Sequence, residues 1–133
     1  MPQNQPTVGI VSVGTYSPKK FITSKEIAEI TGLPEDVIRN KMGIHRKFIG
    51  DENEHPNEMG IKAALDCLSK TNIPPEEIDV VLCSTEEWKE YLLWTAGIDL
   101  AHQIGATNAW AIDLHMRCAT TVPTRVAQVP RRR

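Results

Sequence analysis

Short β-branched runs alternate with amphipathic stretches along this chain. The run Val-Gly-Ile-Val-Ser-Val at residues 8–13 is closed by Gly14 and a turn at Tyr16-Ser-Pro18, a pattern that predicts a buried strand. Two later apolar runs, at residues 78–83 and 108–114, predict a second and a third buried strand.

The segments between these runs carry helix signals. Thr23 followed by Glu26 forms a capping box, which predicts a short helix that extends to about Ile30 and is closed by Gly32. Pro34 fits the first turn of a second short helix, after which Gly43 supplies the left-handed residue. Helices are therefore expected over residues 24–30, 35–41, 59–70 and 95–104, and an extended basic segment over residues 44–49.

Strands that alternate with helices indicate an α/β fold in which parallel strands are joined by helical crossovers. We expect one domain over residues 1–121. Residues 122–133 hold two prolines and end in three arginines, so they cannot form a long apolar helix, and we expect a disordered tail there.

Composition excludes several classes of protein. A formal net charge of −2 argues against nucleic acid as a general partner, because phosphate-binding proteins usually present a basic face. No apolar run approaches transmembrane length, and the first residues lack the pattern of a signal peptide, so we expect no membrane partner. Three cysteines without paired spacing favour a reducing compartment, the cytoplasm by default.

Cys118 is the candidate nucleophile of the chain. It follows the third apolar run, and a cysteine where a strand leads into a helix meets free N–H groups that favour the thiolate. The alternative is an inert apolar residue, which is the favoured reading for Cys67 and Cys83. His115 lies three residues before Cys118, but without a second ligand pair we expect no metal site.

Other polar and aromatic residues have open readings. Two roles are open for Asp113. It could cap or orient a neighbouring element, or it could make a structural hydrogen bond near the end of its strand. His102 is expected at the surface of its helix. Glu86 and Glu87 are expected as charges at a helix N-terminus. The aromatic residues line an acyl tunnel or form a packing or dimer surface; they are Trp88, Tyr91 and Trp94.

The order of these segments resembles the N-terminal half of beta-ketoacyl-ACP synthase III, a condensing enzyme of the thiolase fold. Five runs carry the resemblance, with Cys118 at the position of the nucleophile: residues 14–18, 42–49, 59–64, 78–85 and 111–118. The resemblance implies a thiolase-like half with a mixed sheet and helical crossovers.

The resemblance also implies a chemistry. The cysteine would take an acyl group from acyl-CoA, and the carbanion formed from malonyl-ACP would then attack the bound thioester. The family supplies its catalytic His and Asn from the C-terminal half, and no residue here stands in their place. We therefore expect a truncated chain without full activity. A hydroxymethylglutaryl-CoA synthase-like fragment and a non-catalytic interaction module are the alternatives.

The expected ligands follow from the same resemblance. Acyl-CoA is a substrate, so no cofactor is implied; acyl carrier protein and a second copy of the chain are the implied partners. The family's Trp and Arg for the CoA adenine align without gaps with Val37 and Lys41, so Lys41 would meet a phosphate only as a point charge. Lys41 and Arg46 are the candidate CoA-binding residues.

Overall fold

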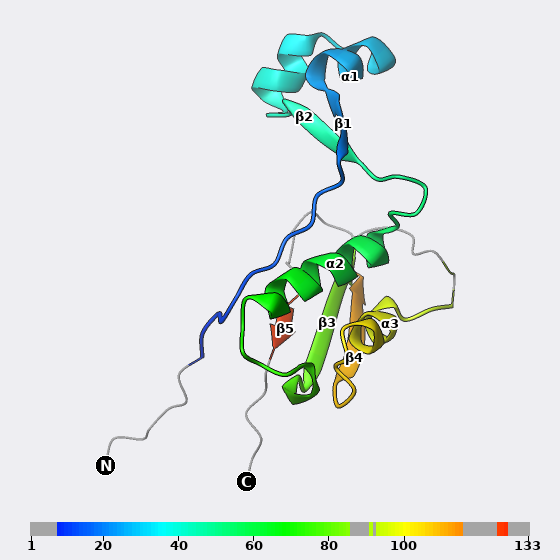
Figure 1. Cartoon of the computed structure of the whole chain (residues 1–133). Helices are drawn as coiled ribbons and strands as arrows, with labels where there is room; N and C mark the ends of the chain where they lie inside the picture. Colours follow the sequence, from blue (N-terminus) through cyan, green and yellow to red (C-terminus); the bar gives the residue numbers. More distant parts are fainter. Residues whose placement is uncertain (1–7, 86–90, 92, 116–124, 128–133) are drawn as a thin grey trace. The chain divides into compact units, whose positions relative to one another are not determined.

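The chain is described by a computed structural model over residues 8–85, 91, 93–115 and 125–127 (Figure 1). It forms two compact units. Unit 1 comprises residues 1–16 together with residues 60–133, and unit 2 comprises residues 17–59.

Unit 1 is built on a three-stranded sheet in the order β4-β3-β5. Strands β3 (Val80–Thr85) and β4 (Trp110–His115) run parallel, and the helix α3 (Ala96–Gln103) lies between them in the sequence. Parallel neighbours require such a crossover. Strand β5 (Arg125–Ala127) pairs with β3 in the antiparallel direction, so the sheet is mixed. The expected α/β fold with a mixed sheet and a helical crossover is confirmed.

The core of unit 1 lies between the sheet and two helices. Figure 1 shows α2 (Pro56–Ser69) and α3 on the same side of the sheet. Val81, the second residue of β3, is fully buried there and pairs with Ala111 of β4. The buried residues that form one cluster are Ile61, Ala64, Ile78, Val81, Leu100, Ala101, Ile104 and Ala106.

The prediction of a buried strand at residues 8–13 is wrong. The segment belongs to no sheet, and its apolar side chains are exposed, with Val11 at 73% and Val13 at 63%. A strand exists only where a neighbouring backbone completes its hydrogen bonds. This segment and the residues that follow it instead bond to α2 and to Lys70 directly after it: Ser12 and Thr15 contact α2, and Val13 contacts Lys70.

Unit 2 contains the antiparallel strands β1 (Lys20–Thr23) and β2 (Arg46–Ile49). The helix α1 (Ser24–Thr31) follows β1 directly. Its capping box is complete: Glu26 N donates to the Thr23 hydroxyl, and Thr23 N donates to the Glu26 carboxylate. Gly32 ends the helix with a φ of 72°. Both ends lie where the sequence predicts them.

The second helix of unit 2 differs in type from its prediction. Residues 35–36 begin an α-helical turn, but Val37–Lys41, labelled η1, is a π-helix. Met42 N accordingly donates to Val37 O at 3.0 Å. A short 3-10 helix, η2 (Pro75–Glu77), occurs in unit 1. π-helical turns are rare and frequently occur at functional sites.

Strand β5 lies within residues 122–133, where the sequence predicts a disordered tail. Residues 125–127 are extended and paired, so that expectation is wrong for these three residues. The rest of this segment lies outside the described residues.

Candidate functional site

The candidate nucleophile Cys118 lies outside the described residues. The structure describes the strand that precedes it, β4, which ends at His115. The parallel partner of β4 is β3, and Thr85 pairs with His115 at the carboxyl end of both strands. In open α/β sheets this is the end at which ligands bind.

Asp113 links β4 to the first turn of α3. Its two carboxylate oxygens accept hydrogen bonds from Ala96 N at 3.0 Å and from Gly97 N at 2.8 Å. Thr95, the N-cap residue of α3, makes no side-chain cap bond, so Asp113 satisfies these amides from another strand. A carboxylate there also interacts favourably with the positive end of the helix dipole. The sequence left a capping role and a structural hydrogen bond open for Asp113, and these two hydrogen bonds fit both readings.

Gly97 permits this close contact. A Cβ atom at Gly97 would lie 3.0 Å from Asp113 Oδ1 and 3.3 Å from the Cβ of Cys83. Cys83 is buried, as its predicted packing role requires. The absence of a side chain at Gly97 therefore lets α3 approach both strands at the point where Asp113 binds it.

The alternate residues of β4 carry exposed apolar side chains. Trp110 is 60% exposed, and Ile112 and Leu114 are exposed as well, whereas Ala111 packs against the core. Successive residues of a strand point to opposite faces. One face of β4 thus packs in the core while the other is apolar and uncovered in the described part of the chain.

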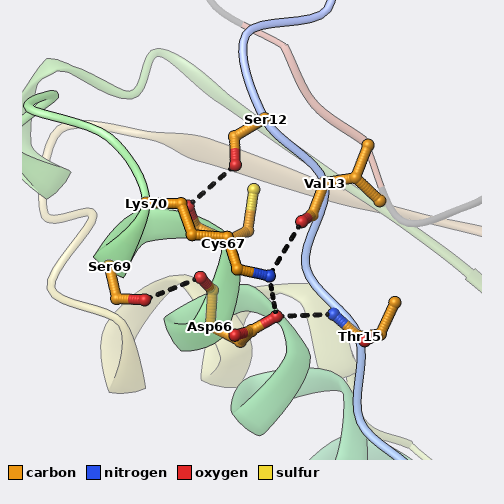
Figure 2. Close-up of polar contacts among 7 residues, drawn as sticks. All are labelled: Ser12, Val13, Thr15, Asp66, Cys67, Ser69 and Lys70. Carbon is orange, nitrogen blue, oxygen red and sulfur yellow. Dashed lines mark hydrogen bonds and ion pairs between the residues drawn. The ribbon is translucent and has the colours of Figure 1, made fainter.

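A clamp of polar contacts joins the N-terminal segment to α2, as Figure 2 shows. Asp66 of α2 accepts a hydrogen bond from Thr15 N at 2.9 Å and pairs with Lys70 at 2.6 Å. Lys70 Nζ in turn donates to Val13 O at 3.3 Å. The hydrogen bond from Lys70, followed by that from Thr15 N, lowers the pKa of Asp66. We call Thr15, Asp66, Lys70 and Val13 the Asp66 clamp.

Two further contacts complete this attachment. The Ser12 hydroxyl donates to Cys67 O at 3.2 Å. Gly14 lies so close to α2 that a Cβ atom there would collide with Ala63 O and with Cys67. No sequence motif points to a role for Asp66. Its spacing from Lys70 signals an i, i+4 ion pair, but Thr15, far away in the sequence, gives no local signal.

Lys41 and Arg46 both lie in unit 2. Lys41 ends η1, Arg46 begins β2, and both are exposed. Gly43 has a φ of 70° and turns the chain between them. The guanidinium of Arg46 lies over two phenyl rings, 5.6 Å from the centroid of Phe21 and 5.1 Å from that of Phe48.

The remaining candidates have separate positions. His102 is exposed on α3, as predicted, and Cys67 is half-buried on α2. Tyr91 and Trp94 meet edge to face with ring centroids 5.5 Å apart, a contact that is compatible with either of the two readings, an acyl tunnel or a packing surface. Glu86, Glu87 and Trp88 lie outside the described residues. The backbone of His115 ends β4, and its side chain is likewise not described.

Among the described residues, no group of three or more His, Cys, Asp or Glu side chains could hold a metal ion. None of the helices in that part of the chain has the length and apolar character needed to span a membrane.

Comparisons with known proteins give one consistent result. No protein-family model matches the chain. The beta-ketoacyl-[acyl-carrier-protein] synthase III of Clostridium acetobutylicum is 34% identical over 112 residues, which cover 84% of this chain and 34% of that protein. The crystal structure of the priming beta-ketosynthase from the R1128 polyketide biosynthetic pathway is similar with a TM-score of 0.71 at 28% identity, covering 80% of this chain and 32% of that one.

A structure of HMG-CoA synthase complexed with CoA is similar in fold alone, with a TM-score of 0.69 at 18% identity over 80% of this chain and 27% of that one. The chain spans about a third of the length of the curated relatives that it matches. In sequence and in its thiolase-like fold, the chain therefore matches the N-terminal half of beta-ketoacyl-ACP synthase III.

Proposed function

We propose that this chain supplies the acyl-accepting part of a condensing enzyme of the beta-ketoacyl-ACP synthase III type. The observation that carries the proposal is the match to such synthases over 84% of the chain. In the sequence, Cys118 comes three residues after the end of β4, which is one of the two parallel strands.

The proposed step transfers the acyl group from the thioester of acyl-CoA to the thiolate of Cys118, which becomes a thioester. The Cys118 thiolate attacks the carbonyl carbon of acyl-CoA, a new carbon–sulfur bond forms, and the bond to the CoA sulfur breaks. CoA leaves as a thiolate, which takes a proton from solvent. Backbone N–H groups at a strand-to-helix turn would stabilise the oxyanion of the intermediate.

The condensation step also needs groups that the family carries outside the part that this chain matches. In the family that the chain resembles, the His and Asn that act on the malonyl group come from the second half. We therefore propose acyl acceptance for this chain, and we propose malonyl-ACP condensation only for a protein that also contains that half. Acyl carrier protein and a second copy of the chain are proposed partners on the same basis.

Lys41 is proposed to bind a phosphate of CoA. It is exposed at the end of the π-helix η1, and an ammonium group binds phosphate as a point charge. The ring contacts of Arg46 favour binding of a protein partner over binding of CoA. The thiols of Cys67 and Cys83, which are half-buried and buried, fit the reducing compartment that we propose, the cytoplasm.

Intact-protein mass spectrometry after incubation with a short acyl-CoA tests the proposal. We expect one acyl adduct on the chain, absent from Cys118→Ala and retained in Cys67→Ala, the matched thiol control on α2. An adduct that persists in Cys118→Ala would contradict the assignment of the nucleophile. No adduct on the unmodified chain would favour the non-catalytic interaction module.

A further inference from the structure

The strands of unit 2 present an aromatic face that carries a single cation. Phe21 pairs with Phe48 in the register of β1 and β2, and Thr23 pairs with Arg46. Because side chains alternate along a strand, these two pairs lie on the same face. Phe21 is 47% exposed and Phe48 41% exposed, so the rings are accessible in the chain. We call Phe21, Phe48 and Arg46 the Arg46 face.

The two rings hold the guanidinium in place. Phe21 and Phe48 meet edge to face with centroids 6.5 Å apart, and the guanidinium carbon lies within 5.6 Å of both centroids. A cation over aromatic rings is attracted by their negative faces. This contact orders the side chain without using its N–H donors, so a ligand would meet a preorganised fork.

The carboxylate beside this face is already engaged: Glu26 accepts hydrogen bonds from the backbone N and the hydroxyl of Thr23, the cross-strand neighbour of Arg46. The two strands contain Lys20, Arg46 and Lys47 but no Asp or Glu. Lys20 pairs with Asp51, whereas Arg46 has no ion pair among the residues that the structure describes. A complementary partner must therefore bring a carboxylate to Arg46 and an apolar side chain to the phenyl rings.

We propose that the Arg46 face binds an acidic segment of a protein partner, one that presents a carboxylate beside an apolar side chain. Arginine and aromatic residues are the side chains most enriched at the centres of protein interfaces. A membrane surface or a nucleic acid would require a cluster of several cations on one face, and this face has one.

The size of the face indicates a transient contact. Strands of four residues are about 13 Å long. A contact centred on them falls in the class below about 1,200 Å² that weak and transient complexes occupy. The proposal does not depend on acyl transfer at Cys118, and either can fail while the other holds.

Binding of a labelled helical peptide to the full chain tests the proposal. The probe carries glutamates and leucines on one face, and its counterpart carries glutamine in place of glutamate. We expect fluorescence anisotropy to show saturable binding of the glutamate peptide that weakens with added salt, and no binding of the glutamine peptide.

Matched variants separate the face from overall charge. Arg46→Glu should lower the affinity about tenfold or more, and Arg46→Lys should lower it less. Lys47→Glu makes the same charge change on the opposite face of the same strand and should change the affinity less than about twofold. Circular dichroism identifies any variant that fails to fold, and Phe48→Leu then serves as a second test of the face with the charge intact.

Three results would overturn the proposal. The first is equal loss of affinity in Arg46→Glu and Lys47→Glu, which would mean that only net charge matters. The second is absence of binding of the glutamate peptide to the unmodified chain. The third is displacement of the peptide by CoA, or tighter binding to anionic vesicles or RNA, which would assign the face to another class of ligand.

Discussion

Gly97 N donates a hydrogen bond of 2.8 Å to Asp113 Oδ1, and this bond ties the first turn of α3 to β4. The two residues come from different elements, so the contact depends on the tertiary fold. It also lies on the strand that leads to Cys118 in the sequence. The stability of this region should therefore respond to changes at either residue.

Asp113→Ala should destabilise the chain by about 1–3 kcal/mol, because it leaves the amides of Ala96 and Gly97 without their acceptor. Asp113→Asn keeps one oxygen as an acceptor for these amides and should therefore lower the stability less than Asp113→Ala does. Urea unfolding followed by circular dichroism measures both changes. Equal stability of Asp113→Ala and the unmodified chain would mean that water replaces the carboxylate at no cost.

Gly97→Ala should destabilise the chain by about 1–3 kcal/mol, because the new methyl group would crowd Asp113 and Cys83. Gly60→Ala in α2 is the matched control. A Cβ atom there makes a contact of 3.4 Å with Leu100 Cδ1, and alanine favours the helix by about 0.5–1 kcal/mol. Thermal unfolding should place the two variants on opposite sides of the unmodified chain.

The Asp66 clamp should depend on pH. Lys70 and Thr15 N lower the pKa of Asp66, so between the lowered pKa and the ordinary value the unfolded chain binds more protons than the folded chain. The clamp is then complete above the ordinary aspartate pKa of about 4 and is lost as the pH falls through the folded value. The Thr15 amide shift in NMR should report this titration.

Asp66→Asn is the matched variant for that titration. It should remove the acid-dependent shift of the Thr15 amide, while the amide of Gly32, which donates to Ala28 O, should behave alike in both proteins. A Thr15 titration that is unchanged in Asp66→Asn would show that another group controls it.

Thr23→Ala should cost about 1 kcal/mol of stability, because it removes the side-chain acceptor of the capping box at α1. Thr23→Ser keeps the hydroxyl and should recover most of the loss. Urea denaturation is the measurement. If serine and alanine give the same stability, the hydroxyl contributes nothing to α1.

The capping box and the segment at residues 8–13 show what can be predicted from this sequence. Thr23 and Glu26 are three residues apart, and their interaction depends only on the local backbone, so the sequence pattern is sufficient. A strand at residues 8–13 depends on a neighbouring backbone as well. An apolar β-branched run therefore indicates a preference for extended backbone, but it does not show that a neighbouring strand is present to pair with it.

The same distinction between local signals and tertiary contacts applies to the candidate site. The strand β4 and the helix α3 are predicted by their hydrophobic patterns. Capping of a neighbouring element is one of the roles that the sequence allows for Asp113. The cation–π contact of Arg46 requires the register of β1 and β2, which no local signal fixes. The π-helix η1 likewise has no distinctive sequence pattern.

The position of β3 between a parallel and an antiparallel neighbour has a consequence for folding order. Val80 pairs with both Trp110 and Ala127. The chain between Val80 and Trp110 contains the crossover helix, and the chain between Val80 and Ala127 is longer. Contacts of shorter sequence separation close with a smaller loss of chain entropy. The β3-α3-β4 unit should therefore form early, and β5, with three paired residues, should join last. Its amides should exchange with deuterium first.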